Sequence, residues 1–240
     1  MRSPAGRFAV NWLLANLSVD SLAILEPHLE FTPLQVGRVL VHPSRLIEHA
    51  YFPGEGVASV LAHAGPDIRL EVGLFGRDGM SASSLLLGAD QTPEETIVQI
   101  SGSGFRIEGR NLLMAVSQSV PLHQSLLKFA HLMALQTAYT AVANGTRSIE
   151  ARLARWLLMC HDRGDNDEIP LTHEFLALML AVRRSGVTLA IQTLEGKGLI
   201  MARRGCITIR RRGGLEALAG ENYGPPEAEY ARMIRPLRRG

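Results

Sequence analysis

The sequence of 240 residues has no apolar run long enough to cross a bilayer. Its longest purely apolar stretch, Phe175–Val182, has eight residues, whereas a membrane-spanning helix needs roughly 18 or more. Near the start of the chain, Asn11 and Asn16 interrupt the apolar residues and no small-residue cleavage site follows, so we expect no secretory signal. We therefore expect a cytoplasmic protein with no membrane partner.

Cysteine is scarce, because the chain contains only Cys160 and Cys206. Two cysteines cannot build a disulfide framework, and on their own they cannot supply a four-cysteine zinc or iron–sulfur site. The histidines show no paired metal-binding signature. We predict no metal and no cofactor, and we leave haem ligation by a single histidine open as an alternative.

The small net charge of +2 hides an uneven distribution. Residues 1–145 carry 9 basic and 12 acidic side chains, a balance of −3, whereas residues 146–240 carry 16 and 11, a balance of +5. Between Arg183 and Arg212 there are eight basic residues against one acid, Glu195. A compact basic block of this kind favours an anionic partner.

The first half of the chain, residues 1–120, is typical of a β domain. After a short helical opening around residues 11–25, brief strands alternate with glycine and proline turns. One stretch alternates between apolar side chains and the residues Arg69, Glu71 and Gly73, which predicts a strand with one buried face. Its apolar members are Ile68, Leu70, Val72 and Leu74. Many short strands at close spacing predict a small antiparallel barrel or roll.

A long helix is predicted over residues 121–145, because Pro121 suits a first turn and no breaker follows until Asn144 and Gly145. The helix has two apolar stripes at helical spacing. They are Leu122, Leu126, Phe129 and Met133, and Leu132, Leu135, Tyr139 and Val142. One stripe can cover the strand domain while the other meets the same helix of a second subunit. The alternative is a helix buried within one subunit.

Residues 146–223 predict a winged helix-turn-helix. A helix over residues 148–163 places Cys160 among packed residues, and Thr172 is a good N-cap for a helix from His173 to about Leu180. A tight turn leads to a further helix over about 183–195, which stops at glycines. The following segment, 199–211, alternates as a hairpin with Arg204-Gly205 at its tip.

The second helix of such a motif enters the major groove of DNA, with its N-terminal residues at the base edges. Arg183, Arg184 and Ser185 occupy that end, and Thr188 lies one turn later. Arginine fits the O6 and N7 atoms of guanine with two hydrogen bonds. The alternative for paired arginines is a solvated helix face.

Further residues suit contacts to the phosphate backbone. The Thr172 hydroxyl and the nearby backbone amides are placed to hold a phosphate. Arginines of the wing would add salt-sensitive affinity without sequence information, namely Arg203, Arg204 and Arg210 to Arg212.

Three segments in the second half carry a resemblance, and two in the first half extend it. They are 149–158 (IEARLARWLL), 171–177 (LTHEFLA) and 182–188 (VRRSGVT), with 51–53 (YFP) and 71–80 (EVGLFGRDGM). Over roughly residues 12–220 the chain resembles the Crp/Fnr family of bacterial transcription regulators. The resemblance implies an α+β fold: an antiparallel β-roll of the cyclic-nucleotide-binding jelly-roll type, a long dimerisation helix and a C-terminal winged helix-turn-helix.

The resemblance also implies residue roles and partners. By position, Thr172 and Glu174 correspond to phosphate-side contacts, whereas Arg184, Ser185 and Thr188 fall on the base-reading face. Leu189 stands where a member of the family has a base-reading arginine, so the DNA sequence recognised should differ. We expect a homodimer that binds a palindromic operator in double-stranded DNA, acts with RNA polymerase and is not an enzyme.

The sensor region departs from the family pattern. Cyclic-nucleotide binders have a Gly-Glu pair followed about ten residues later by an Arg-Ser pair, whereas here Gly79 is followed by Met80 and Ser81. The later segment is 93–96 (PEET), whose carboxylates would repel a phosphate. We predict that cyclic AMP is not bound in the usual way, and the effector and its binding residues stay unassigned.

Two other classes of function stay open. A cupin-like metal enzyme on the roll would need a His-x-His pair, which we do not find; Glu71 and Asp78 are the paired carboxylates closest to such a role. A protein-binding sensor scaffold is the second alternative, although the excess of basic residues after Arg183 argues against it. Beyond Tyr223, at residues 224–240, we expect a mobile tail.

Overall fold

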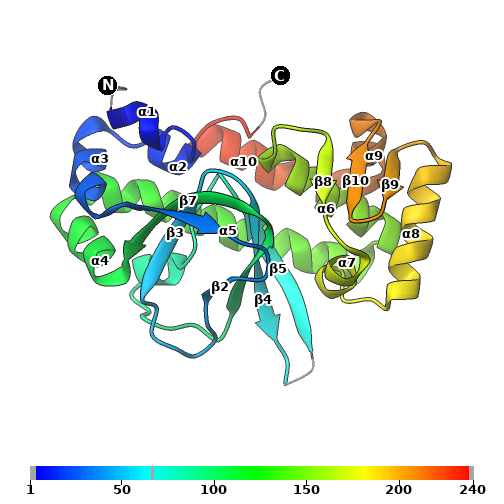
Figure 1. Cartoon of the computed structure of the whole chain (residues 1–240), viewed down its shortest axis with the longest axis horizontal. Coiled ribbons are helices and arrows are strands. Elements are labelled where there is room, and N and C mark those ends of the chain that lie inside the picture. Colours follow the sequence, from blue (N-terminus) through cyan, green and yellow to red (C-terminus); the bar gives the residue numbers. More distant parts are fainter. Residues whose placement is uncertain (1–3, 66–67, 238–240) are drawn as a thin grey trace.

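The structure is a computed structural model that describes residues 4–65 and 68–237. A β-roll, a long helix and a winged helical domain follow one another along the chain, as Figure 1 shows. No helix in these two ranges combines the length and the hydropathy that a bilayer crossing requires.

The roll consists of two antiparallel sheets, in the orders β1-β7-β3 and β2-β6-β4-β5. Its strands are β1 (Glu30–Leu34), β2 (Val39–Val41), β3 (His49–Pro53), β4 (Val57–His63), β5 (Arg69–Phe75), β6 (Glu95–Ile100) and β7 (Gly102–Glu108). Phe52, Phe75 and Phe105 are fully or almost fully buried between the sheets and the helices around them. The predicted antiparallel roll is therefore confirmed.

Short helices close the ends of the roll. They are α1 (Pro4–Phe8), α2 (Trp12–Ala15), α3 (Val19–Leu25), the 3-10 helices η1 (Glu26–His28) and η2 (Ser83–Leu87), and α4 (Gly109–Gln118). Asn11 caps α2 through its side-chain oxygen, and its amide nitrogen donates to the carbonyls of Pro53 and Gly79. One buried side chain thus fixes the helical opening to two turns of the roll.

Strand β5 corrects the predicted burial pattern. Ile68, just before the strand, is 60% exposed, whereas Glu71 on the face predicted to be polar is only 3% exposed. The reason is that a later helix covers the Glu71 face, which an isolated alternation pattern cannot reveal.

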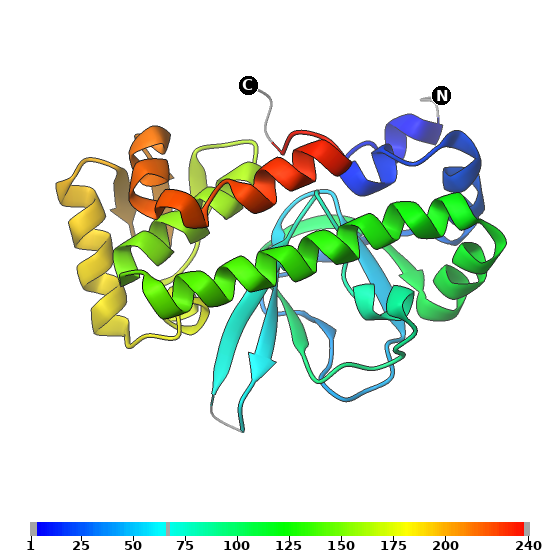
Figure 2. The same cartoon turned by 180° about the vertical axis from the view of Figure 1, so that it is seen from behind.

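Helix α5 (Val120–Thr146) runs along the roll and continues toward the winged domain, as Figure 2 shows. The Ser119 hydroxyl caps it by accepting from the Leu122 backbone amide. The first apolar stripe is buried on the roll at Leu122, Leu126 and Phe129. The second stripe becomes progressively exposed, from Leu132 at 5% to Val142 at 51%.

The winged domain contains a helix-turn-helix and a three-stranded sheet in the order β8-β10-β9. Its elements are α6 (Ile149–Arg163), β8 (Glu168–Pro170), α7 (His173–Met179), α8 (Arg184–Gly196), β9 (Ile200–Arg203), β10 (Cys206–Ile209), α9 (Arg212–Ala219) and the 3-10 helix η3 (Gly220–Asn222). Gly205 has φ 76° at the hairpin tip, a conformation that glycine adopts without strain. The predicted tip at Arg204-Gly205 is confirmed, and Cys160 is buried as predicted.

The segment after residue 223 corrects a second prediction. Instead of a mobile tail, residues Pro225–Met233 form α10, which lies alongside α5 in Figure 2. Tyr230 and Leu237 are buried in the core of the roll, and the Tyr230 hydroxyl donates to the Asp78 carbonyl at 2.7 Å. The buried side chains of Tyr230 and Leu237 therefore hold this charged segment against the roll. Arg238 and Arg239 lie outside the described residues.

Two hydrophobic cores are present, but the second crosses the boundary between the domains. Leu153, Trp156 and Leu157 of α6 pack in one cluster with Leu61 and Leu74 of the roll. The winged domain is therefore seated on the β4–β5 face through buried apolar contacts.

Candidate nucleic-acid interface

Helix α8 presents its N-terminal end to the outside. Arg183 is the N-cap residue in an extended conformation, and Arg184 and Ser185 begin the helix with exposed side chains. The buried side of α8 consists of Val187, Ala190, Ile191 and Leu194. Because this apolar side packs against α6 and α7, the opposite side remains available to a ligand.

A groove of about 810 Å³ separates α8 from the wing. Four of the predicted residues line it: Thr172, Thr188, Arg203 and Arg204. The structure thus brings the N-cap of α7, the middle of α8 and the hairpin tip to one concave surface. The other four, Glu174, Arg183, Arg184 and Ser185, are exposed at the adjoining helix ends.

Glu174 and Arg184 form an ion pair that the sequence did not indicate. Arg184 Nη2 lies 2.7 Å from Glu174 Oε2, and both side chains are well exposed, at 63% and 76%. The Thr188 hydroxyl donates to the Arg184 carbonyl at 3.0 Å. Since exposed ion pairs contribute little to stability, Glu174 can orient Arg184 without preventing it from exchanging to another anion.

The wing arginines do not all face outward. Arg211 donates to the carbonyls of Gly198 and Lys197, and Arg212 Nη2 lies 2.8 Å from Asp162 Oδ1. These contacts satisfy the end of α8 and join α9 to α6. The prediction that the run Arg210 to Arg212 contacts phosphate is therefore corrected for Arg212, whose charge is paired with Asp162 inside the domain. Among the described residues, Arg211 is exposed and bonds only to backbone carbonyls, so its contact with phosphate stays a prediction.

Sequence reasoning missed two polar side chains of the groove. Gln192 and Glu195 also line the groove, and Glu195 Oε1 accepts from the Ala202 backbone amide at 2.7 Å, which ties the wing to α8. Gln192 follows Thr188 by four residues, so helical spacing was a signal that could have found it. The role of Glu195 depends on where the wing folds, and local sequence does not show that.

The family model of the Crp-like helix-turn-helix domain matches residues 151–218. The chain carries a Crp-like helix-turn-helix domain. The match begins in α6, includes α7, α8 and the wing, and ends in α9. It confirms the helix-turn-helix prediction and the resemblance to the Crp/Fnr family.

Solved structures extend the Crp/Fnr likeness to the whole fold. A protein assigned to the Crp/Fnr regulators from Eubacterium rectale shares 16% identity, with a TM-score of 0.67 over 88% of this chain and 99% of that one. FixK2 from Bradyrhizobium japonicum shares 14% identity, with a TM-score of 0.68 over 80% of this chain and 98% of that one. The c-di-GMP-responsive regulator CLP from Xanthomonas campestris shares 15% identity, with a TM-score of 0.61 over 80% of this chain and 99% of that one. At such identities the likeness establishes the fold. A comparison with curated protein sequences finds no significant match.

Together, the Crp-like domain and the Crp/Fnr fold support a DNA-binding transcription regulator.

The roll contains a pocket of about 360 Å³ between its strands and α5. Val72, Phe75 and Met133 contribute apolar walls. Among the described residues that line it, Glu94 carries the only formal charge, and its carboxylate is 3.2 Å from the Thr92 hydroxyl.

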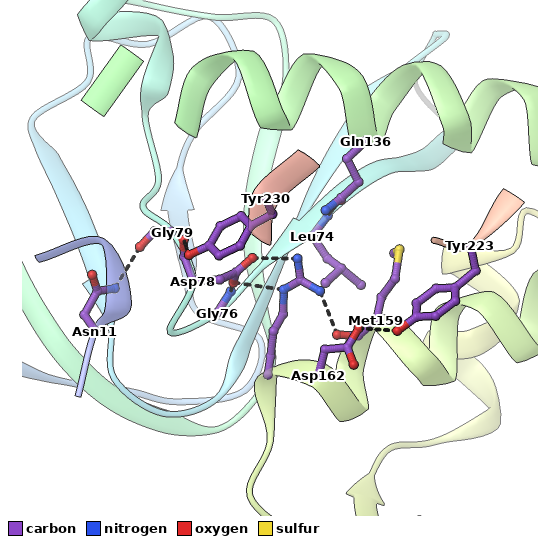
Figure 3. A network of polar contacts seen from close by, with 11 residues as sticks. Asn11, Leu74, Gly76, Asp78, Gly79, Gln136, Met159, Asp162, Tyr223 and Tyr230 are labelled. Carbon is purple, nitrogen blue, oxygen red and sulfur yellow. Dashed lines mark hydrogen bonds and ion pairs between the residues drawn. The ribbon is translucent and has the colours of Figure 1, made fainter. Parts of the chain in front are cut away.

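A buried ion pair joins the roll to the Crp-like domain. Arg163 at the end of α6 donates to Asp78 through Nε at 2.9 Å and Nη2 at 2.6 Å, and the two side chains are 3% and 2% exposed. Asp78 Oδ1 also accepts from the Gly76 amide, and Arg163 Nη1 donates to the Met159 carbonyl. Figure 3 shows Asp78 between Gly76 and Tyr230 in this network. Burial disfavours the charged guanidinium, but the Asp78 carboxylate outweighs burial and raises the pKa of Arg163.

Glu71 makes a second link between the domains. Its Oε2 accepts from the Ser59 hydroxyl at 2.5 Å within the roll and from Trp156 Nε1 of α6 at 3.1 Å. Burial raises the pKa of Glu71 to about 7, although both hydrogen bonds favour the ionised form. Glu71 and Asp78 thus hold the domains together. Among the described residues, no cluster of three or more His, Cys, Asp or Glu is arranged to bind a metal.

Proposed function

We propose that this chain is a homodimeric transcription regulator that inserts α8 into the major groove of a palindromic operator. The observation that carries the proposal is the position of Arg183 and Arg184 at the exposed start of α8, beside a groove edged by Arg203 and Arg204. A helix-turn-helix reads bases from this end of its second helix.

The chemistry of the side chains separates base-reading residues from phosphate-contacting residues within the interface. Arg184, Ser185 and Thr188 lie where base edges would be met, and arginine can grip guanine with two hydrogen bonds. Thr172, Arg203 and Arg204 border the groove, where backbone phosphates would pass. Glu174, predicted as a phosphate-side residue, is better suited to orienting Arg184, because it is paired with that side chain.

The exposed part of α5 supports the dimer. Val142 is 51% exposed, and Ala134, Ala138 and Ala141 are exposed on the same helix. Small and apolar side chains on an exposed helix face allow a second helix to approach closely. A two-fold dimer built in this way would present two α8 helices to successive major grooves, about 34 Å apart.

The roll would act as the sensor for an effector that binds the pocket beside α5. The pocket offers apolar walls and the Glu94 carboxylate, which disfavours the anionic phosphate of a cyclic nucleotide. An effector would act by favouring one arrangement of the domains over another. Such a protein would work in the cytoplasm with RNA polymerase, and it would be a regulator rather than an enzyme.

The proposal is tested by selecting bound fragments from a randomised duplex library with the purified protein. We expect an inverted repeat whose half-sites are about one helical turn apart. Affinity for that operator should fall steeply with salt, because contacts to phosphates release counterions. Recovery of no preferred sequence, in the absence or presence of candidate effectors, would contradict the proposal.

A matched pair of variants locates the interface. The double substitution Arg183→Ala and Arg184→Ala should abolish specific binding and leave the dimer intact. Arg232→Ala removes a similarly exposed arginine, which is paired with Glu229 on α10, and should leave operator affinity nearly unchanged. Equal effects of the two changes on specific binding would show that α8 is not the recognition helix.

A further inference from the structure

An apolar side chain stands in the middle of the proposed reading surface. Leu189 lies on α8 with 61% of its surface exposed, although the apolar residues near it along the chain, Val187 and Ala190, are 0% and 1% exposed. The core of the winged domain is therefore complete without Leu189. A leucine at this position gains little burial within the described structure.

Helical spacing places Leu189 among the residues that would face DNA. Ser185, Leu189 and Gln192 are separated by four and three residues, so they form one exposed stripe along α8. Gln192 lines the groove beside Arg203 and Arg204. Basic side chains at both edges of the stripe favour a polyanion over a membrane core or an apolar protein surface as the natural partner.

The major groove of DNA offers one apolar group at the base edges, the C5-methyl group of thymine. We propose that Leu189 reads a thymine methyl group in each half-site of the operator. This inference rests on the proposed function, because it requires α8 to enter the major groove. It adds a specificity that hydrogen-bonding residues cannot supply, namely discrimination between thymine and the same base without its methyl group.

The expected effect is modest and measurable. Burial of one methyl group corresponds to about fourfold in affinity, and a two-fold dimer makes the contact twice, so the loss over both half-sites is on the order of tenfold. Leu189→Ala should remove the same contact. Because Leu189 is exposed, this variant should fold with unchanged thermal stability.

The experiment replaces each thymine of the selected operator by uracil, one symmetric pair at a time, and measures the affinity of the 240-residue chain for each form. We expect one symmetric pair at which uracil weakens binding on the order of tenfold, with other pairs changing it less than about twofold. Leu189→Ala should bind the thymine and uracil forms of that operator equally, at about the affinity of the original protein for the uracil form. Leu46→Ala, which truncates a similarly exposed leucine of the roll, should keep the full discrimination.

Two results would overturn the inference. One is an operator at which no thymine pair is sensitive to loss of its methyl group; the other is a Leu189→Ala variant that keeps the same preference for thymine over uracil. Failure to recover any operator is a different result, since it refutes the proposed function and removes the inference with it.

Discussion

The ion pair between Asp78 and Arg163 should be the strongest single link between the roll and the winged domain. Arg163→Met leaves the Asp78 carboxylate buried with the Gly76 amide as its hydrogen-bond donor, and Asp78→Asn leaves the guanidinium without its counter-ion. Both changes keep nearly the same volume. They therefore test charge rather than packing.

The expected cost follows from burial. Breaking a buried pair by removing one partner leaves an uncompensated charge, which lowers the free energy of unfolding by about 3–5 kcal/mol. That is a large share of a total that is usually about 5–15 kcal/mol. The double variant should cost about as much as one single variant, so the coupling energy should equal the cost of one single variant, about 3–5 kcal/mol. The exposed pair between Arg106 and Glu30 is the matched control, and Arg106→Met should cost about 0–1 kcal/mol.

Urea unfolding at a fixed protein concentration measures these values, with tryptophan fluorescence and circular dichroism recorded on the same samples. Trp156 reports on the interface because its Nε1 contacts Glu71. In the single variants we expect the fluorescence transition to precede the loss of helix, since the domains separate first. Losses below about 1 kcal/mol in either single variant, or losses that simply add in the double variant, would refute the reasoning.

Three further predictions concern the sensor roll and the dimer. For Glu71, the pKa of about 7 in the folded protein lies above its ordinary value of 4.5, so its burial should lower the free energy of unfolding progressively between about pH 4.5 and 7. In urea unfolding, Glu71→Gln should therefore gain about 3 kcal/mol relative to the original protein between pH 4.5 and 8, whereas the exposed control Glu221→Gln should gain nothing. Equal pH profiles of Glu71→Gln and the original protein would contradict the assignment. Calorimetry with cyclic AMP and cyclic GMP should show no binding with submicromolar affinity, because Glu94 faces the pocket, and such affinity in the original protein would contradict our account of the pocket. Val142→Glu on α5 should shift the dimer toward monomer in sedimentation equilibrium while Val19→Glu on α3 does not, and an unshifted dimer would place the interface elsewhere.

Much of the fold could be predicted because its signals are local. Period-2 alternation indicated strands, helical spacing and Pro121 indicated α5, and the Arg204-Gly205 tip indicated the wing. The basic block from Arg183 onward indicated the reading surface, and the groove brings four of its eight predicted residues together. The roles of those residues stay predictions that the DNA experiments address.

The polar links were not predictable, because their partners are distant in the chain. Glu71 meets Trp156, and Asp78 meets Arg163, each across 85 residues. Arg212 could not be told from a phosphate-binding arginine until Asp162 was seen beside it. In the same way, the sequence of residues 225–233 resembled a charged tail until Tyr230 was found buried in the core of the roll.

The sequence by itself determined which segments form the long helix and the winged helix-turn-helix, where the basic surface lies and which cyclic-nucleotide residues are missing. These properties depend on neighbours within a few positions, on backbone preferences and on the sum of charges. Only the tertiary structure decided which charges are paired inside the protein and which remain for a partner. A carboxylate or guanidinium changes its role when a distant element removes water from around it, because a buried charge needs a partner whereas an exposed one does not.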